Sequence, residues 1–281
     1  MFDWIKRLFR KNAPDVPIIG WSDMPPAEGV VDALLALGKP GIIFRNTDQI
    51  TNSYTGGSPN LGDDFKWPNK NGRPLEFIGQ LALAPISELP PDSPLPIDGA
   101  LSFFYEHSGD APWGIYPGDA GSWKVVYSEI RQETRPPIPP FSRINLVSER
   151  VITYPGYENP AASHIKDLDS LLSQWEDHIP SYEDAAAQAL GFAQAIQADT
   201  MDQECAMIAA RVFDDDPDVY TSPKTAAARA NASDWVFLAQ FSSRESQEIC
   251  FGDCGFIYFW IRKQDLEMLN FDKAWMILQS L

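Results

Sequence analysis

The sequence predicts an α+β fold in which duplicated, antiparallel-rich sheet units form one compact body with helices packed outside. Residues 235–261 support this first, because two runs of aromatic and β-branched residues flank the turn formers Gly252, Asp253 and Gly255. That composition is typical of two connected strands. A similar pair of runs occurs within residues 75–105. Helical and strand-like segments then mix without regular βαβ alternation, which favours α+β over a doubly wound parallel sheet.

The two aromatic pairs correspond position by position. Phe77 to Gln80 aligns with Phe237 to Gln240, and Gly99-x-Leu-x-Phe-Phe aligns with Gly255-x-Ile-x-Phe-Trp. The copies lie about 160 residues apart, too far for a solenoid array. The correspondence predicts an internal duplication, with two related sheet units sharing one core.

The chain is expected to consist of a short N-terminal segment and one domain. Residues 1–16 form the basic segment, and apolar residues near helical spacing within residues 1–11 predict a short amphipathic helix. Residues 17–281 form the α+β domain, with the two repeats at about 41–130 and 190–281.

The remaining elements follow in order along the chain. Residues 27–37 carry good helix formers, and Gly38 and Pro40 end the pattern as at a helix C-terminus. The further predictions for the first half are a buried strand over 41–45, a loop over 52–72, a stiff Pro-rich connection over 85–98 and a strand over 123–127. For the second half they are an extended segment over 143–154, helices over 167–175, 182–190 and 225–232, a helix or a strand over 204–211, an acidic loop over 214–218 and a closing helix over 263–281.

The charge of the chain limits its partners. The formal net charge is −17, and the isoelectric point is about 4.5. Such a surface repels nucleic-acid phosphates, so non-specific nucleic-acid binding is not expected. A basic protein is a suitable partner, because the negative charge of the chain would attract it electrostatically and speed its association.

Cysteine content and hydropathy indicate the compartment. Cys205, Cys250 and Cys254 are too few for a disulfide scaffold, so a cytoplasmic location is expected. The sequence contains no run of about 18 apolar residues, so no transmembrane segment is expected. The three thiols with a histidine could supply four zinc ligands, but only one close-spaced pair exists. Buried structural thiols are therefore expected, and no metal site.

The sequence contains no recognisable catalytic or cofactor motif. His107, His164 and His178 are not accompanied by a Gly-x-Ser-x-Gly elbow. The Gly56-Gly57 pair lacks the Lys-Ser/Thr of a phosphate-binding loop, and the acidic residues from Asp214 onward lack the Gly and Glu of an EF-hand. No catalytic, cofactor-binding or metal-binding residue is predicted.

Gln80 and Gln240 each fall in the middle of an apolar strand, at the same place in the repeat. A buried glutamine must satisfy up to four hydrogen bonds. Two interpretations remain open: each amide holds a neighbouring backbone segment such as the Gly-rich loop, or the pair lines a cleft between the copies. The candidate residues for a cleft or a partner-binding surface are Gln80, Gln240, Trp67, Trp113, Tyr116, Asp214, Asp215, Asp216 and Asp218.

A series of short motifs extends over roughly residues 40 to 279. They include Gly56-Gly57-Ser58-Pro59, Trp67-Pro68, Phe77-Ile78-Gly79-Gln80-Leu81, Trp113-Gly114, Leu190-Gly191-Phe192, Trp235-x-Phe237-Leu238-x-Gln240 and Gly252-Asp253-x-Gly255. In these motifs the chain resembles the YwqG-like family of bacterial proteins, a domain of unknown function. The resemblance implies an α+β architecture and no established activity. It also implies a context, since members occur among candidate immunity proteins encoded beside secreted bacterial toxins.

Two classes of function follow. The first is a non-enzymatic acidic module that binds a basic protein, with toxin neutralisation as the role that the resemblance implies. The alternative is a small-ligand-binding protein or an enzyme, with its site in the cleft between the two repeats, because pockets concentrate at such interfaces.

Overall fold

The computed structural model describes residues 30–87, 95–156, 158–165, 168, 185–212, 219 and 221–280. The helix expected near the N-terminus and the acidic loop over 214–218 lie outside these residues. So does the helix expected over 167–175, apart from Leu168.

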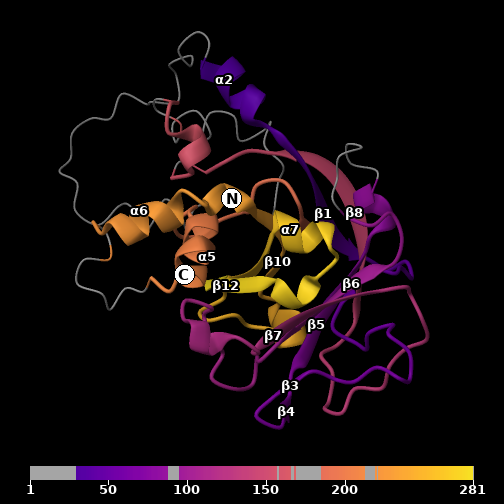
Figure 1. The fold of residues 1–281 in the computed structure, drawn as a ribbon. Helices are drawn as coiled ribbons and strands as arrows, with labels where there is room; N and C mark the ends of the chain where they lie inside the picture. The colour runs from indigo at the N-terminus through magenta and orange to yellow at the C-terminus, as the bar shows by residue number, and fades with distance from the viewer. Residues whose placement is uncertain are drawn as a thin grey trace, which may run out of the picture.

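The described residues form mostly one large antiparallel sheet with a few helices (Figure 1). Ten strands of the described part follow the order β12-β11-β10-β9-β1-β8-β2-β5-β6-β7, and each neighbouring pair is antiparallel. The bounds are β1 (Lys39–Thr47), β2 (Tyr54–Thr55), β5 (Glu76–Ala82), β6 (Ala100–Tyr105), β7 (Trp123–Ser128), β8 (Ile144–Thr153), β9 (Ala185–Ala189), β10 (Trp235–Ser242), β11 (Phe256–Arg262) and β12 (Trp275–Gln279). The short strands β3 (Asn69–Lys70) and β4 (Arg73–Pro74) pair separately.

The two aromatic pairs of the sequence are antiparallel hairpins, as expected. In β5–β6, Phe77 lies opposite Phe104, and the register shifts before Gly79. In β10–β11, Phe237 lies opposite Trp260, and the register shifts before Ala239. Both hairpins therefore carry a bulge one residue after the matching phenylalanine.

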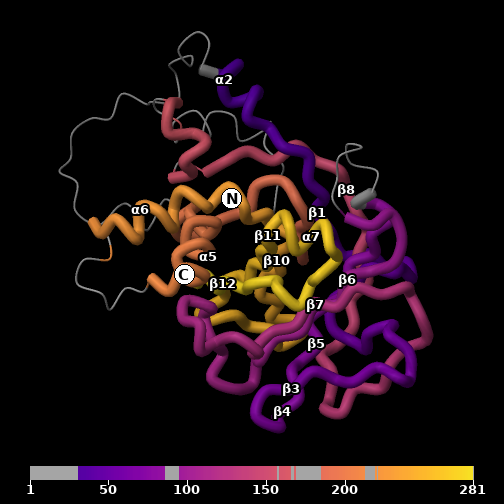
Figure 2. Tube along the Cα trace, in the orientation of Figure 1, coloured from indigo at the N-terminus to yellow at the C-terminus, as the bar shows by residue number. Residues whose placement is uncertain are grey.

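The sheet curls until its two edge strands lie beside each other. Figures 1 and 2 place β12 beside β7, and the Trp123 indole of β7 donates a hydrogen bond of 2.9 Å to Ala274 O, next to β12. Inside the curl, the ring of Phe103 lies 4.9 Å from those of both Phe241 and Phe259. One apolar core therefore joins the two hairpins, which is the largest source of stability for a fold of this kind.

A few short helices accompany the sheet in the described residues. They are α2 (Val30–Leu37), α3 (Ala84–Ser87), α5 (Met201–Ala209), α6 (Pro223–Arg229) and α7 (Lys263–Glu267), with short 3-10 turns at η2 (Pro117–Asp119), η3 (Pro160–Ala162), η5 (Ala232–Asp234), η6 (Glu245–Gln247) and η7 (Phe271–Lys273). Helix α5 covers the outer face of β10–β12 through Met201, Cys205 and Ile208. None of the helices in the described ranges is long and apolar enough to cross a membrane.

Two helix predictions are wrong. Residues 185–189 form β9 rather than part of a helix over 182–190, because these small residues pair with both β1 and β10. Their helix propensity is worth only tenths of a kcal/mol, so the paired strands override it. The closing helix over 263–281 also fails: α7 ends at Glu267, and residues 275–279 pair with β11 as β12.

Candidate functional site

Gln80 lies in β5 with 1% of its surface exposed, and it holds the loop that follows β2. Its Oε1 accepts hydrogen bonds from Asn60 N at 3.0 Å and from the Tyr54 hydroxyl at 3.2 Å. Its Nε2 donates to Asn52 O at 3.0 Å. The amide therefore fixes the backbone on both sides of the Gly56-Gly57 turn, as one of the two interpretations expected.

Gln240 makes a similar contact in the second hairpin. Its Oε1 accepts a hydrogen bond of 2.8 Å from Gln194 N. Opposite it in β9, Gln188 donates from Nε2 to Leu190 O at 2.9 Å and to Phe192 O at 2.7 Å. Gln240 is 2% exposed. Both candidate glutamines thus hold a loop backbone from inside the protein.

Trp67 is half-buried in a small aromatic cluster. Its indole packs edge-on against Phe104 with 5.2 Å between ring centroids, and Nε1 donates to Leu75 O at 2.8 Å. The adjoining cavity, which Phe77 and Pro139 also line, holds only about 10 Å³. That volume is about one water molecule, so Trp67 stabilises the fold around it.

Trp113 and Tyr116 lie in a loop of residues 111–119, which we call the aromatic loop. Their side chains are 41% and 47% exposed, and Ile115 between them is 42% exposed. The aromatic loop therefore presents three large apolar side chains to solvent within four consecutive residues.

The backbone of the aromatic loop is fixed by the edge strand β12. Leu278 N donates to Trp113 O at 2.9 Å, and the Trp275 indole donates to Gly114 O at 2.7 Å. Gly114 has φ of 76°, and a Cβ there would lie 1.7 Å from Met276 O. Only glycine allows so close an approach.

Two polar side chains complete this support. The Asp119 carboxylate accepts hydrogen bonds from Gly114 N at 3.0 Å and from Tyr116 N at 3.3 Å. The Tyr105 hydroxyl donates to Pro112 O at 3.0 Å. Burial raises the pKa of Tyr105, so the hydroxyl keeps the proton that it donates.

The comparison with protein families identifies the chain. A family model described as Domain of unknown function (DUF1963) matches residues 53–280. The chain belongs to the DUF1963 family. No curated protein matches it. The match includes both hairpins and the aromatic loop of the DUF1963 domain.

The cysteines of the DUF1963 domain differ from the prediction in part. Cys205 is buried, as expected, but Cys250 and Cys254 are exposed, so the prediction of buried thiols is wrong for these two. They lie in the turn before β11, where Gly252 and Cys254 have positive φ values, and the turn points them outward. Within the described ranges, no group of three or more His, Cys, Asp or Glu residues is placed to hold a metal ion.

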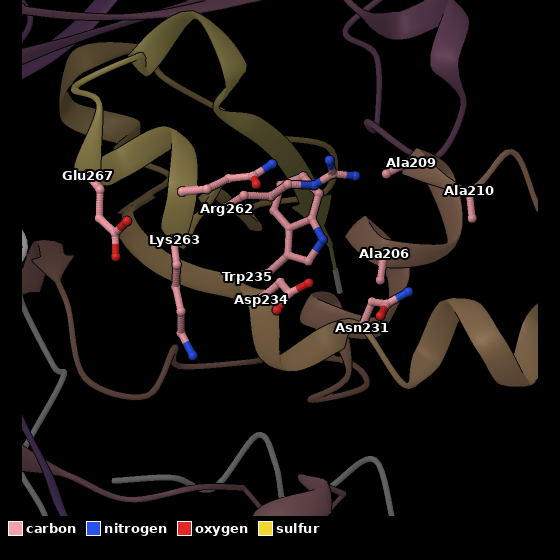
Figure 3. Close-up of a pocket in the computed structure, with 10 residues that line it drawn as sticks. Ala206, Ala209, Ala210, Asn231, Asp234, Trp235, Arg262, Lys263 and Glu267 are labelled. Atoms are coloured by element: carbon pink, nitrogen blue, oxygen red, sulfur yellow. The ribbon is translucent and has the colours of Figure 1, made fainter.

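A cavity of the DUF1963 domain is lined by none of the predicted site residues that the structure describes. It holds about 490 Å³ between α5, η5 and the start of α7 (Figure 3). Trp235 and Arg262, which lie opposite each other in β10 and β11, both line it. Sequence reasoning missed this site because its residues come from five elements, α5, η5, β10, β11 and α7, and only the hairpin register places Trp235 beside Arg262. Asp214, Asp215, Asp216 and Asp218 lie outside the described residues.

Proposed function

We propose that this DUF1963 protein is a non-enzymatic module that binds a basic protein partner and neutralises it, as an immunity protein neutralises a toxin. The single observation that carries the proposal is the aromatic loop, whose backbone is fixed while Trp113, Ile115 and Tyr116 remain exposed. The other candidate residues that lie in the described part serve the fold.

A fixed aromatic loop has the properties of a binding anchor. Tryptophan and tyrosine are enriched among the residues that dominate binding energy in protein interfaces. Their side chains offer large contact areas and lose little conformational entropy on binding. Since Gly114 and Asp119 already hold the backbone, a partner does not have to order the loop.

The charge of the chain supports a basic partner. A net charge of −17 accelerates association with a positively charged protein and makes the association rate sensitive to salt. The three free cysteines support a cytoplasmic location for the encounter. We therefore propose that the aromatic loop makes the main contact with the partner and that the acidic charge of the chain accelerates association.

The experiment uses the double variant Trp113→Ala/Tyr116→Ala. The reading frames beside this gene are first searched for a toxin-like product, and that product is tested by co-expression and by measured affinity at low and high salt. We expect the unsubstituted chain to restore growth and to bind, and the double variant to lose at least tenfold in affinity. Ile50→Ala is the matched control, because Ile50 is an exposed apolar residue outside the aromatic loop, 92% exposed.

Two results would contradict the proposal. One is equal binding by the double variant and the Ile50→Ala control. The other is an association rate that does not change with salt. Thermal melts of both variants establish that any loss of binding is not a loss of folding.

We also propose that the chain is an internal duplication and that it groups with the YwqG-like proteins within DUF1963. The strand order supports the duplication, because β1-β2-β5-β6-β7 and β8-β9-β10-β11-β12 occupy equivalent positions on either side of the β1–β8 pair. The second copy of this proposal therefore begins at β8, before residue 190, where the sequence comparison begins it. Matching loop contacts support it further: Gly56 N donates to Ile78 O, and Leu190 N donates to Leu238 O. In this arrangement the first strand of each copy, β1 or β8, lies beside the second strand of the other copy.

A further inference from the structure

We propose that the cavity beside Trp235 binds a small zwitterion of the α-amino-acid class, with its carboxylate at Arg262, its ammonium group at Asp234 and its apolar side chain over Trp235. This is a small-molecule site distinct from the aromatic loop, and it does not depend on the proposed protein-binding function.

The cavity lies where the C-terminal end of α5 meets the start of β10 and the end of β11. Helix α5 packs over Phe237, Tyr258 and Trp260 of β10 and β11. Trp235 and Arg262 lie two residues beyond Phe237 and Trp260, at the start of β10 and the end of β11. The walls are completed by the C-terminal end of α5, by η5 and by α7, and the lining residues are Ala206, Ala209, Ala210, Asn231, Asp234, Trp235, Arg262, Lys263, Gln264 and Glu267.

Arg262 is held in place by Trp235. Its Cζ lies 5.3 Å from the centroid of the indole ring, a cation–π arrangement, and both side chains are half-buried. None of the described carboxylates forms an ion pair with Arg262. A guanidinium group that is already oriented in this way can receive a carboxylate through two parallel hydrogen bonds.

The charges around the cavity select the class of ligand. Arg262 and Lys263 supply two positive charges, and Asp234 and Glu267 supply two negative ones. Among the lining residues that the structure describes, these charges sum to zero, so a polyanion such as a nucleotide would meet two carboxylates, and a simple cation would meet two basic groups. A molecule that carries one charge of each sign can satisfy both kinds of group.

The positions of these groups suit a compact zwitterion. Figure 3 shows Trp235 between Arg262 and Asp234, with Lys263 and Glu267 farther to one side. Two charged groups therefore flank one aromatic ring. The carboxylate and ammonium groups of an α-amino acid are attached to a single carbon atom, so both can reach their partners while the side chain lies against the ring.

The apolar part of the ligand has a matching surface. Ala206, Ala209 and Ala210 line the α5 side of the cavity, and these short side chains leave room for a side chain of the ligand. A volume of about 490 Å³ falls within the range of ligand pockets, and it is ample for one amino acid.

The test uses L-phenylalanine as the probe, with binding to the full-length chain measured by calorimetry and by chemical-shift changes. The comparison ligands are 3-phenylpropionate, which lacks the ammonium group, and phenethylamine, which lacks the carboxylate. We expect L-phenylalanine to bind at least tenfold more tightly than either, because each analogue leaves one charged group of the site unpaired.

Three variants locate the binding. Arg262→Met keeps an apolar chain over Trp235 and removes the charge, and we expect it to weaken binding at least tenfold. Ala209→Leu fills the cavity without changing its charges, and we expect it to abolish binding. Arg135→Met is the matched control, since Arg135 is an exposed arginine outside the cavity, and its affinity should equal that of the unsubstituted chain.

Several results would overturn the proposal: no binding of L-phenylalanine at millimolar concentration, equal binding of the zwitterion and either analogue, or binding unchanged in both Arg262→Met and Ala209→Leu. The Trp113→Ala/Tyr116→Ala variant separates the two proposals, because it should bind L-phenylalanine normally while losing its protein partner. Thermal melts of each variant accompany the measurements.

Discussion

The hairpins β5–β6 and β10–β11 share one backbone design and differ in what covers them. Each has a bulge one residue after a phenylalanine, Phe77 or Phe237, and a buried glutamine two residues after the bulge. Over the first hairpin, Phe65 and Trp67 close against Phe104 and leave a cavity of about 10 Å³. Over the second, α5 packs against Phe237 and Trp260, and a cavity of about 490 Å³ lies between its C-terminal end and Trp235.

The difference shows that paired strands determine the backbone arrangement, whereas the loops and helices that connect them determine where a cavity or binding surface forms. A strand pair fixes register and burial, and these properties are similar in the two hairpins. A loop or helix laid over the pair is free to pack tightly or to leave a cavity, because it lies at the surface. Both of the sites proposed above accordingly depend on connections, namely the aromatic loop between β6 and β7 and the cover around Trp235.

The largest effect is expected from Phe103→Ala, which breaks the contact between the hairpins. The Phe103 ring touches Phe241 and Phe259 and is fully buried, so its removal should lower the free energy of unfolding by about 3–5 kcal/mol. Urea denaturation followed by tryptophan fluorescence measures the loss. Leu35→Ala, at a partly exposed leucine of α2, is the control.

The number of unfolding transitions tests whether the two hairpins share one core. If the hairpins share one core, Phe103→Ala lowers the midpoint of one cooperative transition. Two separate transitions in the unsubstituted chain would instead mean that the two halves of the sheet are independent units.

A middle-sized effect distinguishes the two glutamines. Gln80→Leu leaves Asn60 N and Asn52 O without their partner, whereas the Tyr54 hydroxyl keeps Ser58 O and Asn60 Oδ1, and the change should cost about 3 kcal/mol. Gln240→Leu removes the acceptor of Gln194 N and should cost about 1–2 kcal/mol. Thermal and urea denaturation of both variants check the order.

Two outcomes would count against this account of the glutamines. Gln80→Leu without loss of stability would mean that the amide is not needed to hold the loop. A variant that stays stable but loses binding of a ligand or a partner would favour the cleft interpretation instead.

The smallest effect concerns the contact between the hairpins at His107. This ring, between Phe141 and Phe251, accepts a hydrogen bond of 3.0 Å at Nε2 from Cys250 N, so that nitrogen is unprotonated. Burial lowers the pKa of His107 below its usual 6.5, although the Glu76 carboxylate acts in the opposite direction. The unfolded chain therefore takes up a proton first as the pH falls.

The sign of the pH dependence follows. The stability contributed by neutral His107 is fully present above about pH 6.5 and is lost as the pH falls below that value toward the folded-state pKa. Urea denaturation at about pH 7.5 and about pH 5.5 measures the loss. His107→Gln keeps an acceptor for Cys250 N without titrating, so its stability should change less over this range. Equal changes in the two proteins would exclude His107 as the cause.

The strands that carry strong local patterns were predictable. Residues 75–81, 99–105 and 235–261 alternate or cluster aromatic and β-branched side chains, and such runs form strands wherever a partner strand is available. The stop at Gly38 also placed the end of α2 correctly. These features depend on neighbours in the sequence.

The helix errors arose where propensity and pairing disagreed. Residues 185–189 are alanine-rich, and only their position between β1 and β10 makes them a strand. Residues 275–279 likewise form a strand because they pair with β11. A pairing contact with a distant strand leaves no local trace in the sequence.

The sequence by itself determined an α+β chain with two aromatic hairpins, a glutamine in each, and a formal net charge of −17. Only the tertiary structure decided what these residues do. It buried Gln80 and Gln240 against loops, fixed Trp113 and Tyr116 at the edge of β12, and left a charged cavity beside Trp235. The physical reason is that propensity and burial patterns act over a few residues, whereas a site requires side chains from several elements to meet.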